Sequence, residues 1–283
     1  MATDSSSSSS SHASRPRLLE RLRDELRVRH YSARTVEAYV GWVRRFVVHH
    51  GRRHPRTMGN REVTEFLTHL AVTDRVSAST QNQALAALRF LYRDVLGDGG
   101  VDLLGDIVQA KRPQRLPVVL TRGEVRAVLA GMRGVPRLVA SLLYGSGLRL
   151  MEGVTLRVHD LDFGRGELTV RSGKGNKDRV TPLPGALHEP LAEHLARARE
   201  RHLSDLESGA GGVSLPEALA RKYPNAGRSW GWQYVFAAAR HYVDPSNGER
   251  RRHHVHETVV QRAVRESLLA TGITKHATCH TFR

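Results

Sequence analysis

The stretch GSGLRLME, residues 145–152, decides the fold of the second half of the chain. An apolar segment over about 137–144 precedes it, and the spacing of its apolar residues predicts a helix that ends at these glycines. Arg149 and Glu152 follow, one helical turn apart. The two side chains could simply pair on a solvated face, or Arg149 could bind an anion. The segments that follow favour the second interpretation.

After residue 152, three short segments have the pattern of strands: 158–163, 167–171 and 179–183. The last two flank SGKGNKD, residues 172–178, whose glycines predict a hairpin turn. Lys174 and Lys177 lie in this turn. They could be ordinary charges at a hairpin tip, but a lysine on a flexible turn can also deliver a proton to a leaving oxygen.

The rest of the second half is mostly helical in pattern. Thr121 and Glu124 have the spacing of a capping box, which predicts a helix that ends near Gly131. Further helices are predicted over two ranges, 186–206 and 257–270. The stretch between them, 209–256, looks irregular and polar. The second half therefore predicts a mainly α domain with a small antiparallel β-sheet.

The first half predicts only helices up to Gly97. Apolar residues recur at three- and four-residue spacing in four segments, about 18–26, 33–50, 63–70 and 79–96. Ser32 is the expected N-cap of the second helix. The chain is thus expected to have four parts: a disordered serine-rich tail (1–14), an all-α domain (15–97), a basic linker (98–117) and the second domain (118–283).

The charge of the chain favours a polyanionic partner. Lysine and arginine number 44 and aspartate and glutamate 28, so the formal net charge is +16. Each phosphate that such a protein neutralises releases counterions. Arginine far outnumbers lysine, which the codon bias of a GC-rich genome could also produce. The chain has neither a secretory signal nor an apolar run near the ~20 residues of a membrane helix, and its single cysteine, Cys279, fits a reducing compartment. We expect a cytoplasmic protein.

The residues HTFR, 280–283, complete a set of groups suited to phosphoryl transfer. Negative charge builds up on the nonbridging oxygens when a nucleophile attacks a phosphodiester, and the planar fork of arginine neutralises it. His280 can assist proton transfer, and Arg283 adds a second fork. Two arginines, a lysine and a histidine need neither metal nor cofactor for this reaction. Each of these residues could by itself be an ordinary surface residue. Together and in this order they point specifically to phosphoryl transfer.

In this order the blocks resemble those of the tyrosine recombinases: GSGLRLME, GKGNKDR (173–179) and HTFR. The first half resembles the helical, SAM-like core-binding domain of the same family. Further blocks resemble the integron integrase subgroup: HYSART (30–35), TQNQAL (80–85), KRP (111–113), ARKYPNA (220–226), WGWQYVF (230–236) and RRHH (251–254). The resemblance extends from about residue 17 to the last residue.

The resemblance implies a role for single residues and a reaction. Arg149 and Arg283 match the two catalytic arginines. Lys174 matches the general acid and His280 the histidine of the last block, while Glu152 supports Arg149. A tyrosine attacks the DNA phosphate and forms a 3′-phosphotyrosine link, which a strand of the partner duplex displaces. Four protomers form the synapse, and no nucleotide cofactor, small-molecule substrate or membrane takes part.

The same resemblance implies a set of DNA contacts. In the first domain and the linker these are Tyr31, Arg34, Thr35, Gln81, Asn82, Lys111, Arg112 and Arg115. On the hairpin they are Lys177 and Arg179. The partner is expected to be DNA, both double-stranded and as a folded single strand that forms the attachment site.

The stretch 209–256 matches the insertion that separates integron integrases from other members. Unpaired bases that protrude from a folded strand stack on aromatic or histidine rings, at ~1–3 kcal/mol per base. The candidates for these contacts are Trp230, Trp232, Tyr234, His253 and His254. Both tryptophans could instead pack in the core, and Ala237 stands where the subgroup has proline.

A metal site is an alternative for the histidines of this stretch. His253, His254 and His256 lie close to Glu257 in the sequence. Adjacent histidines rarely share one ion, however, and no cysteine or paired histidine has the spacing of a structural site. We expect no metal.

No tyrosine follows the last block. The seven tyrosines all precede His280: Tyr31, Tyr39, Tyr92, Tyr144, Tyr223, Tyr234 and Tyr242. Since the resemblance places the nucleophile after Arg283, we expect the chain to lack it, to have an incomplete catalytic domain and to be a fragment of the enzyme. The alternative is a truncated protein that binds the same sites without cutting them. A helical transcription regulator is more distant, because the blocks around Arg149 and the hairpin lysines argue against it.

Overall fold

The computed structural model describes residues 17–97, 109–111, 116–171, 173, 177–245 and 247–283. The chain divides into two compact units, Met1–Arg115 and Leu116–Arg283. Each unit has its own hydrophobic core. The serine-rich tail and most of the expected linker lie outside the described residues.

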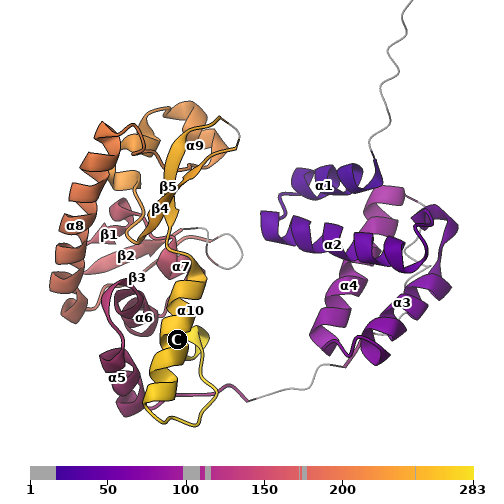
Figure 1. Cartoon of the computed structure of the whole chain (residues 1–283), viewed down its shortest axis with the longest axis horizontal. Helices are drawn as coiled ribbons and strands as arrows, with labels where there is room; N and C mark the ends of the chain where they lie inside the picture. The colour runs from indigo at the N-terminus through magenta and orange to yellow at the C-terminus, as the bar shows by residue number, and fades with distance from the viewer. Residues whose placement is uncertain (1–16, 98–108, 112–115, 172, 174–176, 246) are drawn as a thin grey trace, which may run out of the picture. The chain divides into compact units, whose positions relative to one another are not determined.

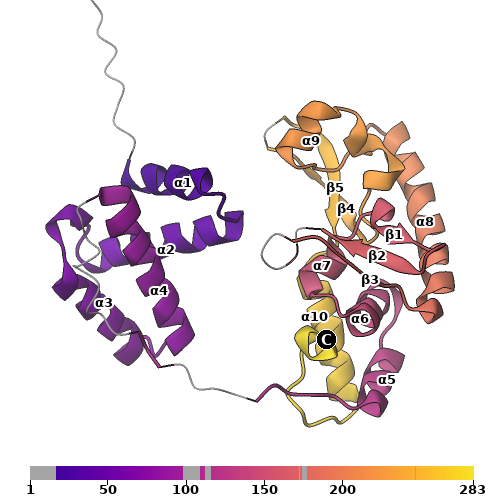
Figure 2. The ribbon, with the colours of Figure 1, turned by 180° about the vertical axis from the view of Figure 1, so that it is seen from behind.

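The first unit is a bundle of helices (Figures 1 and 2). Its helices are α1 (Leu18–Val28), α2 (Ala33–His49), α3 (Asn60–Val72) and α4 (Ala78–Phe90), with a short 3-10 turn at Pro55–Thr57. Ser32 caps α2, because its hydroxyl accepts the backbone N–H of Thr35 at 3.2 Å. Phe46 and Phe66 are almost wholly buried in the core between the helices. The prediction of an all-α first domain is confirmed.

The last helix of this unit changes its hydrogen bonding before residue 96. α4 ends at Phe90, and the chain continues with π-helical bonding over Leu91–Leu96. Tyr92 is buried in this segment, and its hydroxyl lies 3.1 Å from the carbonyl oxygen of Pro55. Apolar spacing predicts one continuous helix here, because it does not distinguish an α-helix from a short π-helical turn.

The second unit is built around α6 (Figures 1 and 2). Its helices are α5 (Arg122–Gly131), α6 (Gly134–Ser146), α7 (Leu150–Val154), α8 (His188–Glu207), α9 (Glu217–Lys222) and α10 (Glu257–Ala270). α5, α7 and α10 pack against α6, as does the 3-10 turn Cys279–Phe282. Thr121 and Glu124 form the expected capping box of α5. The predicted end of that helix at Gly131 is confirmed.

Two small antiparallel sheets complete this unit. β1 (Leu161–Asp162), β2 (Glu167–Val170) and β3 (Arg179–Pro182) form one sheet in that order, and β4 (Ala237–Val243) pairs with β5 (Arg250–His254). The strand predicted over 158–163 is wrong in its first half, where Val158–Asp160 is a 3-10 turn. The reason is tertiary: the backbone N–H of Val158 donates to the carbonyl of Gln233 at 3.0 Å instead of to a neighbouring strand.

The stretch 209–256, expected to be irregular, contains α9 and the β4–β5 hairpin (Figure 1). Neither strand of this hairpin alternates apolar and polar residues in the way that predicts a strand. β4 reads AAARHYV and β5 reads RRRHH. Contacts with α8 stabilise the hairpin in place of an apolar face. The predicted overall class, mainly α with small antiparallel sheets, is confirmed.

Candidate active site

Arg149, Glu152 and Arg179 form a connected ion cluster. Arg149 is the N-cap residue of α7, and Glu152 lies in the first turn of that helix. Glu152 accepts the backbone N–H of Arg149 and its Nη1, both at 2.8 Å. Arg179, at the start of β3, donates to both oxygens of Glu152, at 3.0 and 2.6 Å. The Arg149–Glu152 pair follows from local sequence, and the hairpin brings Arg179 to it.

This arrangement leaves Arg149 able to bind an anion. Its Nε and Nη2 groups have no partner among the described residues, and 30% of its side chain is exposed. Burial raises the pKa of Glu152, but hydrogen bonds from Arg179 and Arg149 outweigh this effect and lower the pKa to about 2. Glu152 therefore stays ionised at neutral pH and orients Arg149; it does not donate a proton there.

The turn between β2 and β3 approaches the same cluster. The backbone N–H of Gly173 donates to the carbonyl of Lys177 at 3.0 Å. A Cβ atom at Gly173 would lie only 2.8 Å from Nη1 of Arg179, so a larger residue would displace that arginine. Lys177 is exposed and makes no ion pair with the described residues. Lys174, the expected general acid, lies outside the described residues.

His280 and Arg283 are both exposed at the last turn of the chain. Cys279 and Phe282 are buried and fix this turn in the core. His280 lines a groove of about 760 Å³ together with Leu150, the residue that follows Arg149. The fold thus brings the last block to the same groove as the start of α7. Within the described part of the chain, the side chains of His280 and Arg283 have no hydrogen-bond partner.

Several expected DNA contacts of the first unit lie at its surface. Tyr31, Arg34 and Lys111 are exposed. The ring of Tyr31 packs edge-on against Phe90, with the centroids 5.7 Å apart. Thr35 is half-buried and bonds to the capping residue of α2. Two further candidates, Arg112 and Arg115, lie outside the described residues.

Gln81 and Asn82 use their amide groups within the protein. Gln81 donates from Nε2 to the carbonyl of Leu67 at 3.1 Å. Asn82 pairs with both backbone groups of Ala110, each at 2.9 Å. These contacts connect α4 to α3 and to residue 110. In this structure both amide groups therefore have hydrogen-bond partners within the protein.

Three of the ring-bearing candidates, Tyr234, His253 and His254, form a ring cluster with Tyr242 of β4, centred on His253; Tyr234 lies just before β4. His253 is exposed, whereas Tyr234 and His254 are each only 8% exposed. Ring centroids of Tyr234, Tyr242 and His254 lie 5.6, 6.0 and 4.0 Å from that of His253. We call these four residues the hairpin ring cluster. His253 is therefore the exposed ring of this cluster.

Both tryptophans of the insertion are half-buried and pack against histidines. The ring of Trp230 lies 5.8 Å from that of His202 on α8. The ring of Trp232 meets His159 edge-on at 4.5 Å. Neither tryptophan belongs to the buried core, and each leaves part of its ring at the surface.

A buried ion cluster around Asp160 was not predicted. Asp160 is 5% exposed and accepts Nε of Arg171 at 2.7 Å and the backbone N–H of Arg157 at 2.9 Å. The guanidinium group of Arg157 lies over the ring of Tyr234, 3.8 Å from its centroid. Arg157 and Asp160 repeat the spacing of Arg149 and Glu152, and this spacing is the signal that predicts the cluster.

Two histidines of α8 hold the insertion. Nε2 of His194 donates to the carbonyl of Val235 at 2.8 Å, and Nε2 of His202 donates to the carbonyl of Arg228 at 3.1 Å. Burial lowers the pKa of both histidines below the ordinary value, and the hydrogen bonds to carbonyls offset this only in part. Both rings are therefore neutral when the insertion is docked at neutral pH.

Acidification should destabilise the second unit through these histidines. A histidine with a lowered pKa in the folded state gives its full stability above pH ~6.5, and that stability is lost as the pH falls from there through the folded-state pKa. We expect the free energy of unfolding, measured by urea at pH 7.5 and 5, to decrease. His194→Gln keeps an N–H donor without a titrating ring, so its decrease should be smaller. An unchanged pH dependence in this variant would contradict the assignment.

His256, the residue before α10, has a structural role. Nδ1 of His256 accepts the backbone N–H of Thr258 at 3.3 Å and thereby caps the helix. No group of three or more His, Cys, Asp or Glu side chains within the described ranges is placed to hold a metal ion. Of the helices described, none is long and apolar enough to cross a membrane.

Comparison with known proteins identifies the family. Residues 18–99 match the model of the phage integrase N-terminal SAM-like domain, and residues 119–283 match that of the phage integrase family. An integrase/recombinase from Escherichia coli is 50% identical over 267 residues, which cover 94% of this chain and 79% of the relative. Tyrosine recombinase XerD from Mycobacterium leprae (strain TN) is 33% identical over 206 residues, or 65% of this chain and 63% of that protein.

The fold is also that of solved recombinases. The lambda integrase tetramer bound to a Holliday junction aligns with a TM-score of 0.59 and 16% identity, over 94% of this chain and 66% of that one. The lambda integrase dimer bound to a core site gives the same TM-score. The chain belongs to the phage integrase family of tyrosine recombinases.

Proposed function

We propose that this chain belongs to the integron integrases, which insert and excise gene cassettes at DNA attachment sites through a 3′-phosphotyrosine intermediate. Arg149 and Arg283 bind the nonbridging oxygens of the phosphate that is cut, Lys174 protonates the leaving oxygen, and His280 assists proton transfer. The reaction takes place in a synapse of four protomers and needs neither metal nor cofactor.

The hairpin ring cluster is the observation that carries the subgroup assignment. An exposed histidine ring next to two tyrosine rings is suited to stack an unpaired base, and a duplex offers no such base outside its stack. The free Nε and Nη2 groups of Arg149 support the phosphate contact. Exposed Tyr31, Arg34 and Lys111 support a DNA-binding role for the first unit.

Binding of folded single-stranded DNA tests this proposal. The 283-residue chain should bind a folded attachment-site strand with unpaired bases more tightly than a scrambled hairpin of the same length. His253→Ala should weaken this binding about 5- to 100-fold, the effect of one stacked base, and should change duplex affinity little. Tyr223→Ala removes another exposed ring of the insertion and is the matched control. Equal affinity for the folded site and the scrambled hairpin would overturn the subgroup assignment.

We also propose that none of the seven tyrosines is the nucleophile. Tyr92 and Tyr234 are buried, and all seven precede His280, whereas the family resemblance orders the nucleophile after it. The alternative function is a protein that binds attachment sites without cutting them. It also predicts that none of these seven tyrosines cuts DNA. A nicked suicide substrate tests it, because cleavage leaves the protein covalently attached to DNA. A covalent adduct of the 283-residue chain would contradict the proposal.

A further inference from the structure

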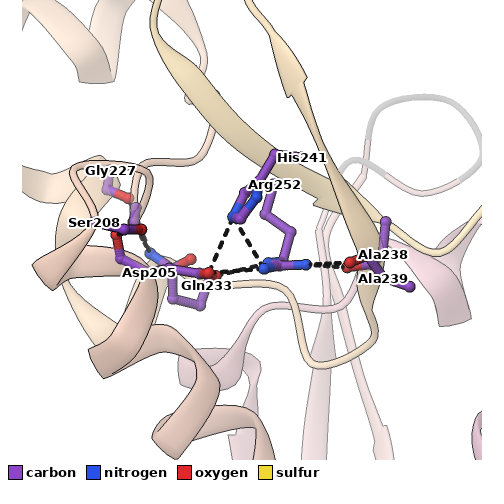
Figure 3. Close-up of polar contacts among 9 residues, drawn as sticks. Asp205, Ser208, Gly227, Gln233, Ala238, Ala239, His241 and Arg252 are labelled. Atoms are coloured by element: carbon purple, nitrogen blue, oxygen red, sulfur yellow. Dashed lines mark hydrogen bonds and ion pairs between the residues drawn. The ribbon is translucent and has the colours of Figure 1, made fainter.

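The guanidinium group of Arg252 holds the β4–β5 hairpin on α8 (Figure 3). Arg252 is 8% exposed and donates from Nε and Nη2 to the two oxygens of Asp205, both at 2.7 Å. Nη2 also lies 2.9 Å from Nε2 of His241, on β4. Nη1 donates to the carbonyls of Ala238 and Ala239, both at 2.8 Å. We call Asp205, His241 and Arg252 the hairpin anchor.

The hairpin anchor uses four of the five N–H groups of Arg252, on the two carboxylate oxygens of Asp205 and the carbonyls of Ala238 and Ala239. Nε2 of His241 also lies 3.0 Å from Oδ1 of Asp205, the oxygen that accepts Nη2 of Arg252. Burial raises the pKa of Asp205, but the ion pair with Arg252 outweighs it, and the net pKa is lowered. Arg252 is 8% exposed and bonded on all three guanidinium nitrogens, so it is committed inside the protein and is not placed to bind a DNA phosphate.

The neighbouring arginines of β5 differ. Arg251 pairs with Glu249 and Asp244 near the hairpin tip. Arg250 is exposed and has no ion pair with the part of the chain that the structure describes. Of this run of three arginines, only Arg252 is buried. Arg251 lies on the opposite face of the strand, and Arg250, on the same face as Arg252, lies two residues nearer the hairpin tip and is exposed.

The anchor also sets the irregular pairing of the two strands. Ala237 pairs with His254 and His241 pairs with Arg252, so residues 238–240 all lie opposite His253. Such a bulge leaves carbonyl groups without a partner in the ladder. Nη1 of Arg252 satisfies two of them, those of Ala238 and Ala239. A slip of the register by one residue would exchange the faces of Arg252 and His253.

We infer that the hairpin anchor is a specificity-determining element: it positions His253 and the hairpin ring cluster for an unpaired base without touching the DNA itself. This inference rests on the proposed function. It assigns to Asp205, a residue of α8, a role in choosing between folded single-stranded sites that carry an unpaired base and sites that lack one. Gln233, whose Nε2 donates to the carbonyl of Gly227 at 2.9 Å, holds the segment before β4 (Figure 3).

The test uses two DNA hairpins that differ by one unpaired base. The affinity of the 283-residue chain for each is measured, and their ratio is the selectivity. Arg252→Lys keeps the charge but cannot bond both oxygens of Asp205 and both carbonyls with one ammonium group. It should lower the selectivity about tenfold, to near one, while affinity for the base-deleted hairpin changes less than about threefold. His241→Ala keeps the Asp205–Arg252 ion pair, and its loss of selectivity should be smaller. If Arg252→Lys folds poorly, His241→Ala provides the test instead.

A matched control is Glu249→Gln, which breaks an ion pair with Arg251 on the same hairpin but at its exposed end. Its selectivity should equal that of the unsubstituted chain. Equal loss of affinity for both hairpins in Arg252→Lys and His241→Ala would mean a purely structural role and would overturn the inference, as would unchanged selectivity in both. A selectivity near one in the unsubstituted chain would instead overturn the proposed function, and the inference with it.

Discussion

An Arg149→Ala variant should lose strand cleavage by about 10²–10³-fold, the effect of removing one preorganised donor from a site that stabilises developing charge. Arg149 is held by Glu152 with two of its nitrogen groups free, so its contribution is largest when charge builds up on the phosphate. DNA affinity should fall by less than about tenfold, because one phosphate contact among several is lost.

Cleavage is measured as covalent adduct on a nicked attachment site. Since we propose that the nucleophile is not among the seven tyrosines, the measurement uses residues 1–283 fused to a segment that supplies a nucleophilic tyrosine. Arg165→Ala is the matched control, because Arg165 is an exposed arginine of the same unit, paired with Glu167 at 3.6 Å. Equal losses of cleavage and affinity in Arg149→Ala would show that Arg149 only anchors the phosphate.

A Glu152→Ala variant should destabilise the second unit by about 3–5 kcal/mol, as expected when one partner of a buried ion cluster is removed. Glu152 is 9% exposed and is the shared acceptor of Arg149 and Arg179. Without it, two guanidinium groups of like charge remain close together in a partly desolvated place. The backbone N–H of Arg149 also loses its cap. The free energy of unfolding in urea measures this effect.

Two further variants make this result specific. Glu152→Gln keeps the shape of the side chain and one acceptor oxygen. Its free energy of unfolding should therefore fall less than that of Glu152→Ala. Glu167→Ala removes an exposed partner of Arg165 and should change stability by no more than about 1 kcal/mol. If Glu152→Ala lowered the free energy of unfolding no more than Glu167→Ala, the cluster around Arg149 would not stabilise the fold.

The candidate site was predictable where its residues are near in sequence. Arg149 and Glu152 have the spacing of a capping box, and the structure places both at the start of α7 as a bonded pair. Arg179 was predicted as a DNA contact, but its two bonds to Glu152 depend on how β3 and its turn lie against α7. Asn82 likewise matched a DNA-contact block, yet its amide pairs with the backbone of Ala110.

Local sequence by itself determined the longer helices, several of their caps and the order of the blocks. Apolar spacing and capping residues act within one or two turns, so α2 and α5 begin where Ser32 and Thr121 predict. The β4–β5 hairpin was decided only by tertiary structure. Its second strand, RRRHH, has no apolar face to fix a register, so nothing local says which side chains point inward. Asp205, far away in sequence on α8, draws Arg252 inward and thereby leaves His253 at the surface.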